Sequence, residues 1–194
     1  MHRRKTILVL AGLSAAMGDA PTIATPPPPI GKPGDCAAPI YASDRLVCAD
    51  PGLLAADRAL AALLPPRTAP GVAIEDQGAW FRRSRLCAMR PDHAGCLRAA
   101  YRERIAVLTA ARGFDPATAP WAANRCAPAR AELAELPGGV VAVRRDRGGP
   151  VTLALAGADP ALWTPFAWAA TSGVRYTIRW LDGAALKCRV VHRR

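Results

Sequence analysis

The chain has 194 residues, and its 26 basic and 15 acidic residues give a formal net charge of +11 at pH 7. This length suits one ordinary domain or two small ones. The positive surplus favours anionic neighbours such as cell-wall polymers, lipid head groups or acidic proteins. Because the sequence carries no nucleic-acid-binding motif, nucleic acid is not an expected partner.

Residues 1–18 have the pattern of a secretory signal peptide. A basic start, residues 1–5, precedes an apolar run, residues 6–17, that is too short to span a bilayer. Small residues, Ala16 and Gly18, favour cleavage after Gly18. No cysteine follows directly, and no later segment is apolar enough for a transmembrane helix. We therefore expect a soluble protein that is periplasmic or secreted.

A helical module is predicted for residues 36–112, after a proline-rich linker over residues 19–35. Four consecutive prolines in that linker favour an extended polyproline II conformation. Asp50 and Asp92 are expected N-caps, and Pro51 suits a first helical position. The expected helices cover residues 43–48, 51–64, 74–88 and 93–112.

The pattern of residue types changes after a second predicted linker, residues 113–124. Residues 125–194 contain short apolar and β-branched runs separated by glycine-rich turns, which predict a small antiparallel β domain. The alternation from Tyr176 to Trp180, followed by Asp182-Gly183, predicts a hairpin. The expected strands cover residues 140–143, 151–155, 174–180 and 185–191. The predicted fold class is α+β, a disulfide-stapled module of three or four helices followed by a disulfide-closed β domain.

Six cysteines in an exported chain indicate disulfides, and six cysteines allow fifteen pairings. The chain has no C-x-x-C motif or Cys/His cluster with zinc spacing, so neither a metal nor a cofactor is expected. Proximity along the chain favours the pairs Cys36–Cys48, Cys87–Cys96 and Cys126–Cys188.

A further pattern links the first four cysteines to the predicted helices. It contains Leu-x-x-Ala-Asp-x-x-Leu, then Gln-x-x-Trp, then Cys-Leu-x-x-x-Tyr-x-x-Arg-Ile-x-x-Leu. Beside the cysteines, it is carried by Asp44, Leu53, Asp57, Leu60, Gln77, Trp80, Leu97, Tyr101, Arg104, Ile105 and Leu108. Over residues 36–108 this pattern resembles the N-terminal module of the LprI family of lysozyme inhibitors. The resemblance implies a non-catalytic protein that binds a lysozyme or another muramidase.

The module framework is expected to consist of Asp57, Gln77, Trp80, Tyr101 and Arg104. Trp80 and Tyr101 fall on apolar helix stripes, which indicates core positions. The chain departs from the family at two positions. Ser84 stands where the family usually has arginine, and Asp44 stands where it usually has glutamate.

The C-terminal part carries a second, shorter resemblance. The run from Ser172 to Tyr176 reads Ser-Gly-Val-Arg-Tyr, and the segment from Cys126 to Cys188 closes a domain of about this size. Both features are similar to the MliC-type lysozyme inhibitors, β-barrels that insert a Ser-Gly-x-x-Tyr loop into the lysozyme cleft. The resemblance implies that Ser172 and Tyr176 contact a partner. The alternative is that Tyr176 is an ordinary strand residue.

Three aromatic residues lie close together at Trp163, Phe166 and Trp168, interrupted by Pro165. They could form an exposed platform for a sugar or a protein partner, because exposed aromatic side chains are common binding anchors. A small β core also needs aromatic residues. Trp163 and Trp168 are therefore candidate binding residues, with a core position as the alternative.

No catalytic arrangement stands out, so we do not expect an enzyme. The two histidines after the leader, His93 and His192, accompany no serine in a nucleophile elbow. Glycoside chemistry needs two carboxylates. Glu103 lies between two arginines on a predicted helix, and Glu132 and Glu135 are expected to be solvated.

The helix arginines suggest an alternative function. Their simplest interpretation is a solvated helix face, and the sharper one is a surface that binds anionic cell-wall or outer-membrane polymers. The residues concerned are Arg82, Arg83, Arg85, Arg98 and Arg102.

Overall fold

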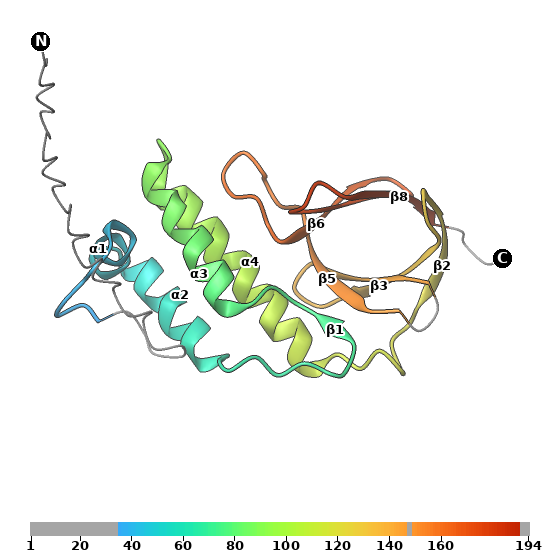
Figure 1. The fold of residues 1–194 in the computed structure, drawn as a ribbon, viewed down its shortest axis with the longest axis horizontal. Coiled ribbons are helices and arrows are strands. Elements are labelled where there is room, and N and C mark those ends of the chain that lie inside the picture. The colour runs from blue at the N-terminus through green and yellow to red at the C-terminus, as the bar shows by residue number, and fades with distance from the viewer. Residues whose placement is uncertain (1–34, 147–148, 191–194) are drawn as a thin grey trace, which may run out of the picture.

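A computed structural model describes residues 35–146 and 149–190, with the helices at one end and a β-barrel at the other (Figure 1). The expected signal peptide, residues 1–18, and almost all of the expected linker, residues 19–35, lie outside the described residues. No helix in the described part is long and apolar enough to cross a membrane.

The helical part contains four α-helices and one 3-10 helix among the described residues. Three of the α-helices begin at an aspartate whose side chain accepts a backbone N–H, as expected for Asp50 and Asp92 and also seen for Asp76. The elements are α1 (Ala42–Ala49), α2 (Pro51–Ala62), α3 (Gln77–Arg85), η1 (Leu86–Met89) and α4 (His93–Gly113).

The β part is a closed barrel of seven strands, with an eighth strand added at one side. Along the sheet the order is β1-β5-β4-β3-β2-β8-β7-β6, and a pairing between β5 and β6 closes it. The strands are β1 (Val72–Ala73), β2 (Ala122–Ala127), β3 (Ala131–Leu136), β4 (Val140–Arg145), β5 (Val151–Ala156), β6 (Ala167–Ser172), β7 (Arg175–Trp180) and β8 (Ala185–Val190).

The α+β fold class is confirmed, but the sheet is mixed and not purely antiparallel. Strand β5 runs parallel to β1 and to β6. The chain leaves β5 through a long connection, residues 157–166, that packs Trp163 against the helices, so it enters β6 in the same direction. β1 lies inside the predicted helical module, in the segment between the expected helices 51–64 and 74–88. β2 begins at Ala122, within the range predicted to be linker.

The three disulfides pair as predicted: Cys36–Cys48, Cys87–Cys96 and Cys126–Cys188. Cys126 and Cys188 face one another in the register of β2 and β8. This bond therefore joins two neighbouring strands, on the side that faces the barrel interior. Disulfides of this kind are typical of proteins that work in an oxidising compartment.

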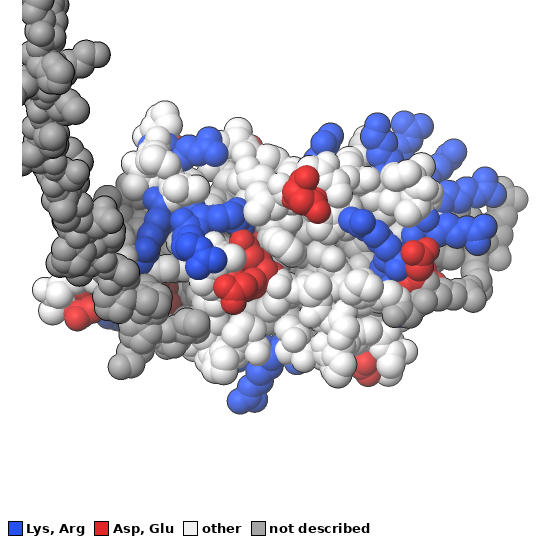
Figure 2. All heavy atoms as spheres, in the orientation of Figure 1, with Lys and Arg blue, Asp and Glu red and all other residues white. Residues whose placement is uncertain are grey.

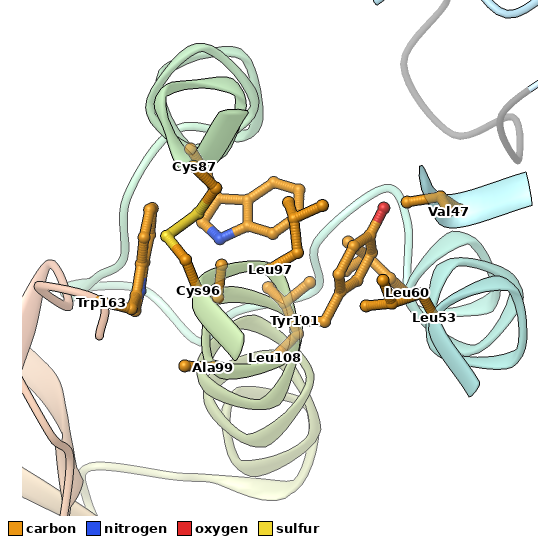
Figure 3. Close-up of a cluster of buried hydrophobic side chains, with 12 residues drawn as sticks. Val47, Leu53, Leu60, Cys87, Cys96, Leu97, Ala99, Tyr101, Leu108 and Trp163 are labelled. Carbon is orange, nitrogen blue, oxygen red and sulfur yellow. A yellow bond between two sulfur atoms is a disulfide. The ribbon is translucent and has the colours of Figure 1, made fainter. Parts of the chain in front are cut away.

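The helices and the barrel share buried surface through α4. One side of α4 contributes Leu97, Tyr101 and Leu108 to the helical core, which also takes in Trp163 from the barrel part (Figure 3). Its other side contributes Val107 to a second cluster with residues of β4 and β5. A third cluster fills the barrel interior. The helix is therefore covered on two sides.

Candidate functional site

The five predicted framework residues lie together in the helical part. The Tyr101 hydroxyl donates to Asp57 Oδ1 at 3.0 Å, and Arg104 Nε donates to Gln77 Oε1 at 2.9 Å. The Trp80 and Tyr101 rings meet edge to face, with 5.4 Å between centroids. Trp80 is 2% exposed and Tyr101 8% exposed, which confirms their predicted core positions.

Arg104 is the most deeply buried charge of this framework, at 2% exposure. Burial lowers the pKa of its guanidinium, and the negative charge of nearby Glu75 opposes this shift. Its Nη1 donates to the Glu75 backbone carbonyl at 2.8 Å. Burial also raises the pKa of Tyr101, and the Asp57 charge adds to that effect. Trp80, Tyr101 and Arg104 are therefore buried inside the helical part, whereas Asp57 and Gln77 are half-buried.

The two positions where the chain departs from the family pattern have local roles. Ser84 is buried, and its hydroxyl donates to the Phe81 carbonyl at 3.0 Å. The Asp44 side chain accepts the Tyr41 backbone N–H at 3.0 Å, at the start of α1. Asp44 forms no ion pair among the described residues, and Ser84 carries no charge.

A buried network of polar contacts, which we call the polar joint, links the helices to the β5–β6 connection. It consists of Glu75, Arg83 and Glu103 from the helical part and Trp163, Thr164 and Phe166 from the connection. Glu103 on α4, which lies between two arginines in the sequence, is 3% exposed. Its Oε2 accepts the Trp163 Nε1–H at 2.6 Å, and its Oε1 accepts the Phe166 backbone N–H at 2.9 Å. Burial raises the pKa of Glu103, and the hydrogen bond from Trp163 opposes that rise.

A second contact of the joint comes from Arg83 on α3. Its Nε and Nη2 each donate to a different oxygen of Glu75 at 2.7 Å, and its Nη1 donates to the Thr164 carbonyl at 2.7 Å. The guanidinium also lies 4.3 Å from the Trp163 ring centroid. A bidentate pair of this geometry is among the stronger polar contacts in proteins.

The predicted exposed aromatic platform is wrong for Trp163. This side chain is 6% exposed, because its ring fills the helical core and its N–H satisfies Glu103 (Figure 3). Phe166 is half-buried and packs against the barrel core. Trp168 is half-buried on the outer side of β6, since Ala167 and Ala169 point inward. The three aromatics do not form one surface.

The segment from Ser172 to Tyr176 is a tight hairpin between β6 and β7. Ser172 faces Arg175 in the register, so only Gly173 and Val174 form the turn. Gly173 has a φ of 57°, a backbone conformation that favours glycine. The residues from Ser172 to Arg175 are exposed, so the tip of the hairpin is accessible and its backbone is held by the two strands.

Tyr176 lies just behind this tip and is both a strand residue and part of the hairpin. Its side chain is half-buried at one end of the barrel interior. Its hydroxyl donates to Glu135 Oε1 on β3, and this bond raises the pKa of Tyr176 to about 12. Glu135 is exposed, as expected. This contact anchors the base of the hairpin to the opposite side of the barrel.

Three of the five helix arginines are occupied by contacts within the protein. Arg83 belongs to the polar joint, and Arg98 forms an ion pair with Asp50. Arg85 lies over the rings of Tyr41 and Phe81. Their interpretation as one solvated face is therefore wrong. Arg82 and Arg102 are exposed and have no side-chain partner in the described part of the chain.

Among residues 35–146 and 149–190, no group of three or more His, Cys, Asp or Glu side chains could hold a metal ion. His93 is half-buried at the start of α4, and His192 lies outside the described residues. A scan against protein-family models, a search of curated proteins and a search of solved structures each found no match.

Proposed function

We propose that this protein is an exported, non-catalytic inhibitor that binds a muramidase and blocks its substrate cleft with the β6–β7 hairpin. The observation that carries the proposal is the exposed, two-residue turn flanked by Ser172 and Arg175. A short turn whose backbone is held by two paired strands suits a concave cleft, because little conformational freedom is lost on binding. The three disulfides support a periplasmic or secreted location.

The side chains at the tip match the chemistry of a muramidase cleft. Glycoside hydrolases carry a pair of carboxylates at the scissile bond. Arg175 is exposed and its side chain forms no hydrogen bond or ion pair with another described residue, so its guanidinium is available to pair with such a carboxylate. The Ser172 hydroxyl lies on the neighbouring strand, directly opposite Arg175, and can donate a second hydrogen bond.

The charge of the chain bears on which muramidase it would bind. Without Arg3, Arg4 and Lys5 of the predicted leader, the formal net charge falls from +11 to about +8. A basic enzyme would be repelled at long range, which slows association. The proposal therefore favours a muramidase with an acidic surface.

A turbidity assay of bacterial cell-wall lysis tests the proposal. Wild-type protein in micromolar excess should inhibit at least one class of lysozyme, and acidic muramidases should be included in the panel. Arg175→Ala should raise the inhibition constant at least about tenfold, because truncating one partner of a buried charge pair costs about 2–5 kcal/mol.

Arg179→Ala is the matched control for that variant. Arg179 lies on the same strand and the same outer side of the barrel, and it is also exposed, but it is four residues away from the tip. Both variants remove one positive charge, so they change the net charge equally. Because Arg179 lies away from the tip, its variant should change the inhibition constant by less than about threefold. Absence of inhibition for every lysozyme class, or equal losses for the two variants, would contradict the proposal.

A further inference from the structure

Five basic side chains gather on the outer face of three neighbouring strands, β2, β8 and β7. Figure 2 shows Lys and Arg atoms over the end of the molecule that carries β2 and β8. The side chains that fill the barrel interior alternate with these residues along the strands, so the basic ones point outward. We call this set the cationic face; it consists of Arg125, Arg175, Arg179, Lys187 and Arg189, all of them exposed.

The register places like charges directly opposite one another. Arg189 on β8 faces Arg125 on β2 and Arg175 on β7. Neighbouring strands lie about 4.8 Å apart, so these arginines form a row about 10 Å long. Like charges that face one another across strands destabilise a sheet. This row therefore lowers folding stability unless a ligand of opposite charge neutralises it.

The protein itself supplies no neutralising partner in the described residues. Strands β2, β7 and β8 contain no acidic residue. The ion pairs in the described part of the chain use other arginines, and Glu132, on the neighbouring strand β3, is held by Arg144. The five side chains of the cationic face form no hydrogen bond or ion pair with any described residue.

Exposed apolar side chains lie at both ends of β7, beside the cationic face. Val174 and Leu181 are each 42% exposed. A soluble polyanion offers these side chains nothing apolar to contact. A membrane surface does, because basic side chains meet the phosphates there while apolar ones enter the head-group region.

We infer that the cationic face is a docking surface for the phosphate head groups of an anionic membrane. Guanidinium groups bind phosphate in a bidentate manner, which suits a face of four arginines and one lysine. Each basic residue near such a surface strengthens binding about fivefold. The inference does not rest on muramidase binding, since four of the five residues of the cationic face lie away from the hairpin tip and only Arg175 belongs to both surfaces.

Vesicle co-sedimentation of the oxidised full chain tests this inference. Vesicles of equal parts phosphatidylcholine and phosphatidylglycerol should bind the protein, and vesicles of phosphatidylcholine alone should not. The triple variant R125Q/K187Q/R189Q should bind about 100-fold more weakly, at about fivefold per residue. It leaves residues 172–176 unchanged and should therefore keep any muramidase inhibition that the wild type shows.

A second triple variant, R58Q/R82Q/R102Q, is the matched control. It removes the same number of charges from exposed helix positions that have no side-chain partner in the described part of the chain. Its binding to the anionic vesicles should stay within about threefold of wild type, because these charges lie away from the docking surface. Equal losses for the two triple variants would overturn the inference, since net charge alone would then explain binding.

Two further measurements do not depend on the folding of the triple variants. Binding of the wild type should weaken as sodium chloride rises, because salt screens the attraction to phosphate. V174S/L181S, which keeps every charge, should bind about fivefold more weakly because it removes apolar contacts with the membrane. Capture by soluble polyphosphate without capture by anionic vesicles would overturn the inference, as would equal binding to neutral vesicles.

Discussion

Substitution of Trp163 by phenylalanine is expected to lower the free energy of unfolding by about 3 kcal/mol. The Trp163 Nε1–H donates to the buried Glu103 carboxylate at 2.6 Å, and phenylalanine has no such donor. A hydrogen bond to a charged group contributes about 1.5–3 kcal/mol. The smaller ring also leaves a cavity in the helical core, which adds about 1 kcal/mol.

The same substitution at Trp168 is the control. Trp168 is half-buried on the outer side of β6, and its ring nitrogen has no partner in the described part of the chain. W168F should cost about 1 kcal/mol or less. Guanidinium-induced unfolding of the oxidised protein, followed by far-ultraviolet circular dichroism, gives both free energies by linear extrapolation. Equal losses at the two positions would refute the assignment of Trp163 to the joint.

The loss in unfolding free energy caused by W163F should depend on pH, and this dependence separates loss of the hydrogen bond from loss of side-chain volume. Burial raises the pKa of Glu103 in the folded state, and the Trp163 donor opposes that rise. Between the unfolded value of about 4.3 and the raised folded value, the native protein holds a proton that the unfolded chain has lost, so stability falls as pH rises. W163F makes this fall larger. Its cost should be smallest near pH 4 and grow toward pH 7; a constant cost would indicate volume alone.

Two further predictions concern the barrel. Replacing Cys126 and Cys188 by alanine opens a loop with a sequence separation of 62 residues, and thermal unfolding should show a loss of about 4 kcal/mol; an unchanged melting temperature would contradict this. Glu135→Gln should lower the pKa of Tyr176 from about 12 toward 10, measured by tyrosine NMR titration, and an unchanged pKa would exclude the bond. Because the raised pKa belongs to the folded state, this bond stabilises below about pH 10, and its contribution is lost as pH rises from there to about 12.

The helices could be predicted from the sequence because their signals are local. Asp50, Pro51 and Asp92 each act within one turn; Asp50 and Pro51 begin α2, and Asp92 begins α4, as expected. The third helix is shorter than predicted. The structure starts it at Gln77 and tightens its end into the 3-10 helix η1, where Cys87 meets Cys96.

Three barrel strands could not be predicted because their local preferences oppose the structure. β3 has the sequence Ala-Glu-Leu-Ala-Glu-Leu, which consists of strong helix formers. β2 and β6 are rich in alanine, a residue depleted in strands. These segments become strands because the barrel needs small inward side chains, such as Ala167 and Ala169, opposite large ones such as Ile178 and Trp180. That requirement is a tertiary one.

The polar joint is not evident from the sequence neighbours of Glu103, which are arginines, but from the helix face on which Glu103 lies. Ala99, Glu103, Val107 and Ala111 recur every four residues on α4, and all four are buried. This stripe lies beside the stripe of Leu97, Tyr101 and Leu108 and identifies a helix covered on two sides. A carboxylate inside such a stripe indicates a buried partner in another element.

The predicted framework and the proposed contact surface are connected through this joint. Arg104 holds the backbone of Glu75, whose carboxylate binds Arg83. Arg83 and Glu103 in turn hold the β5–β6 connection, which leads directly into β6. Buried residues of the helical part therefore fix the start of β6, the strand that ends at the hairpin. It follows that substitutions in the framework should lower stability, whereas substitution of the exposed Ser172 side chain should change binding with little effect on stability.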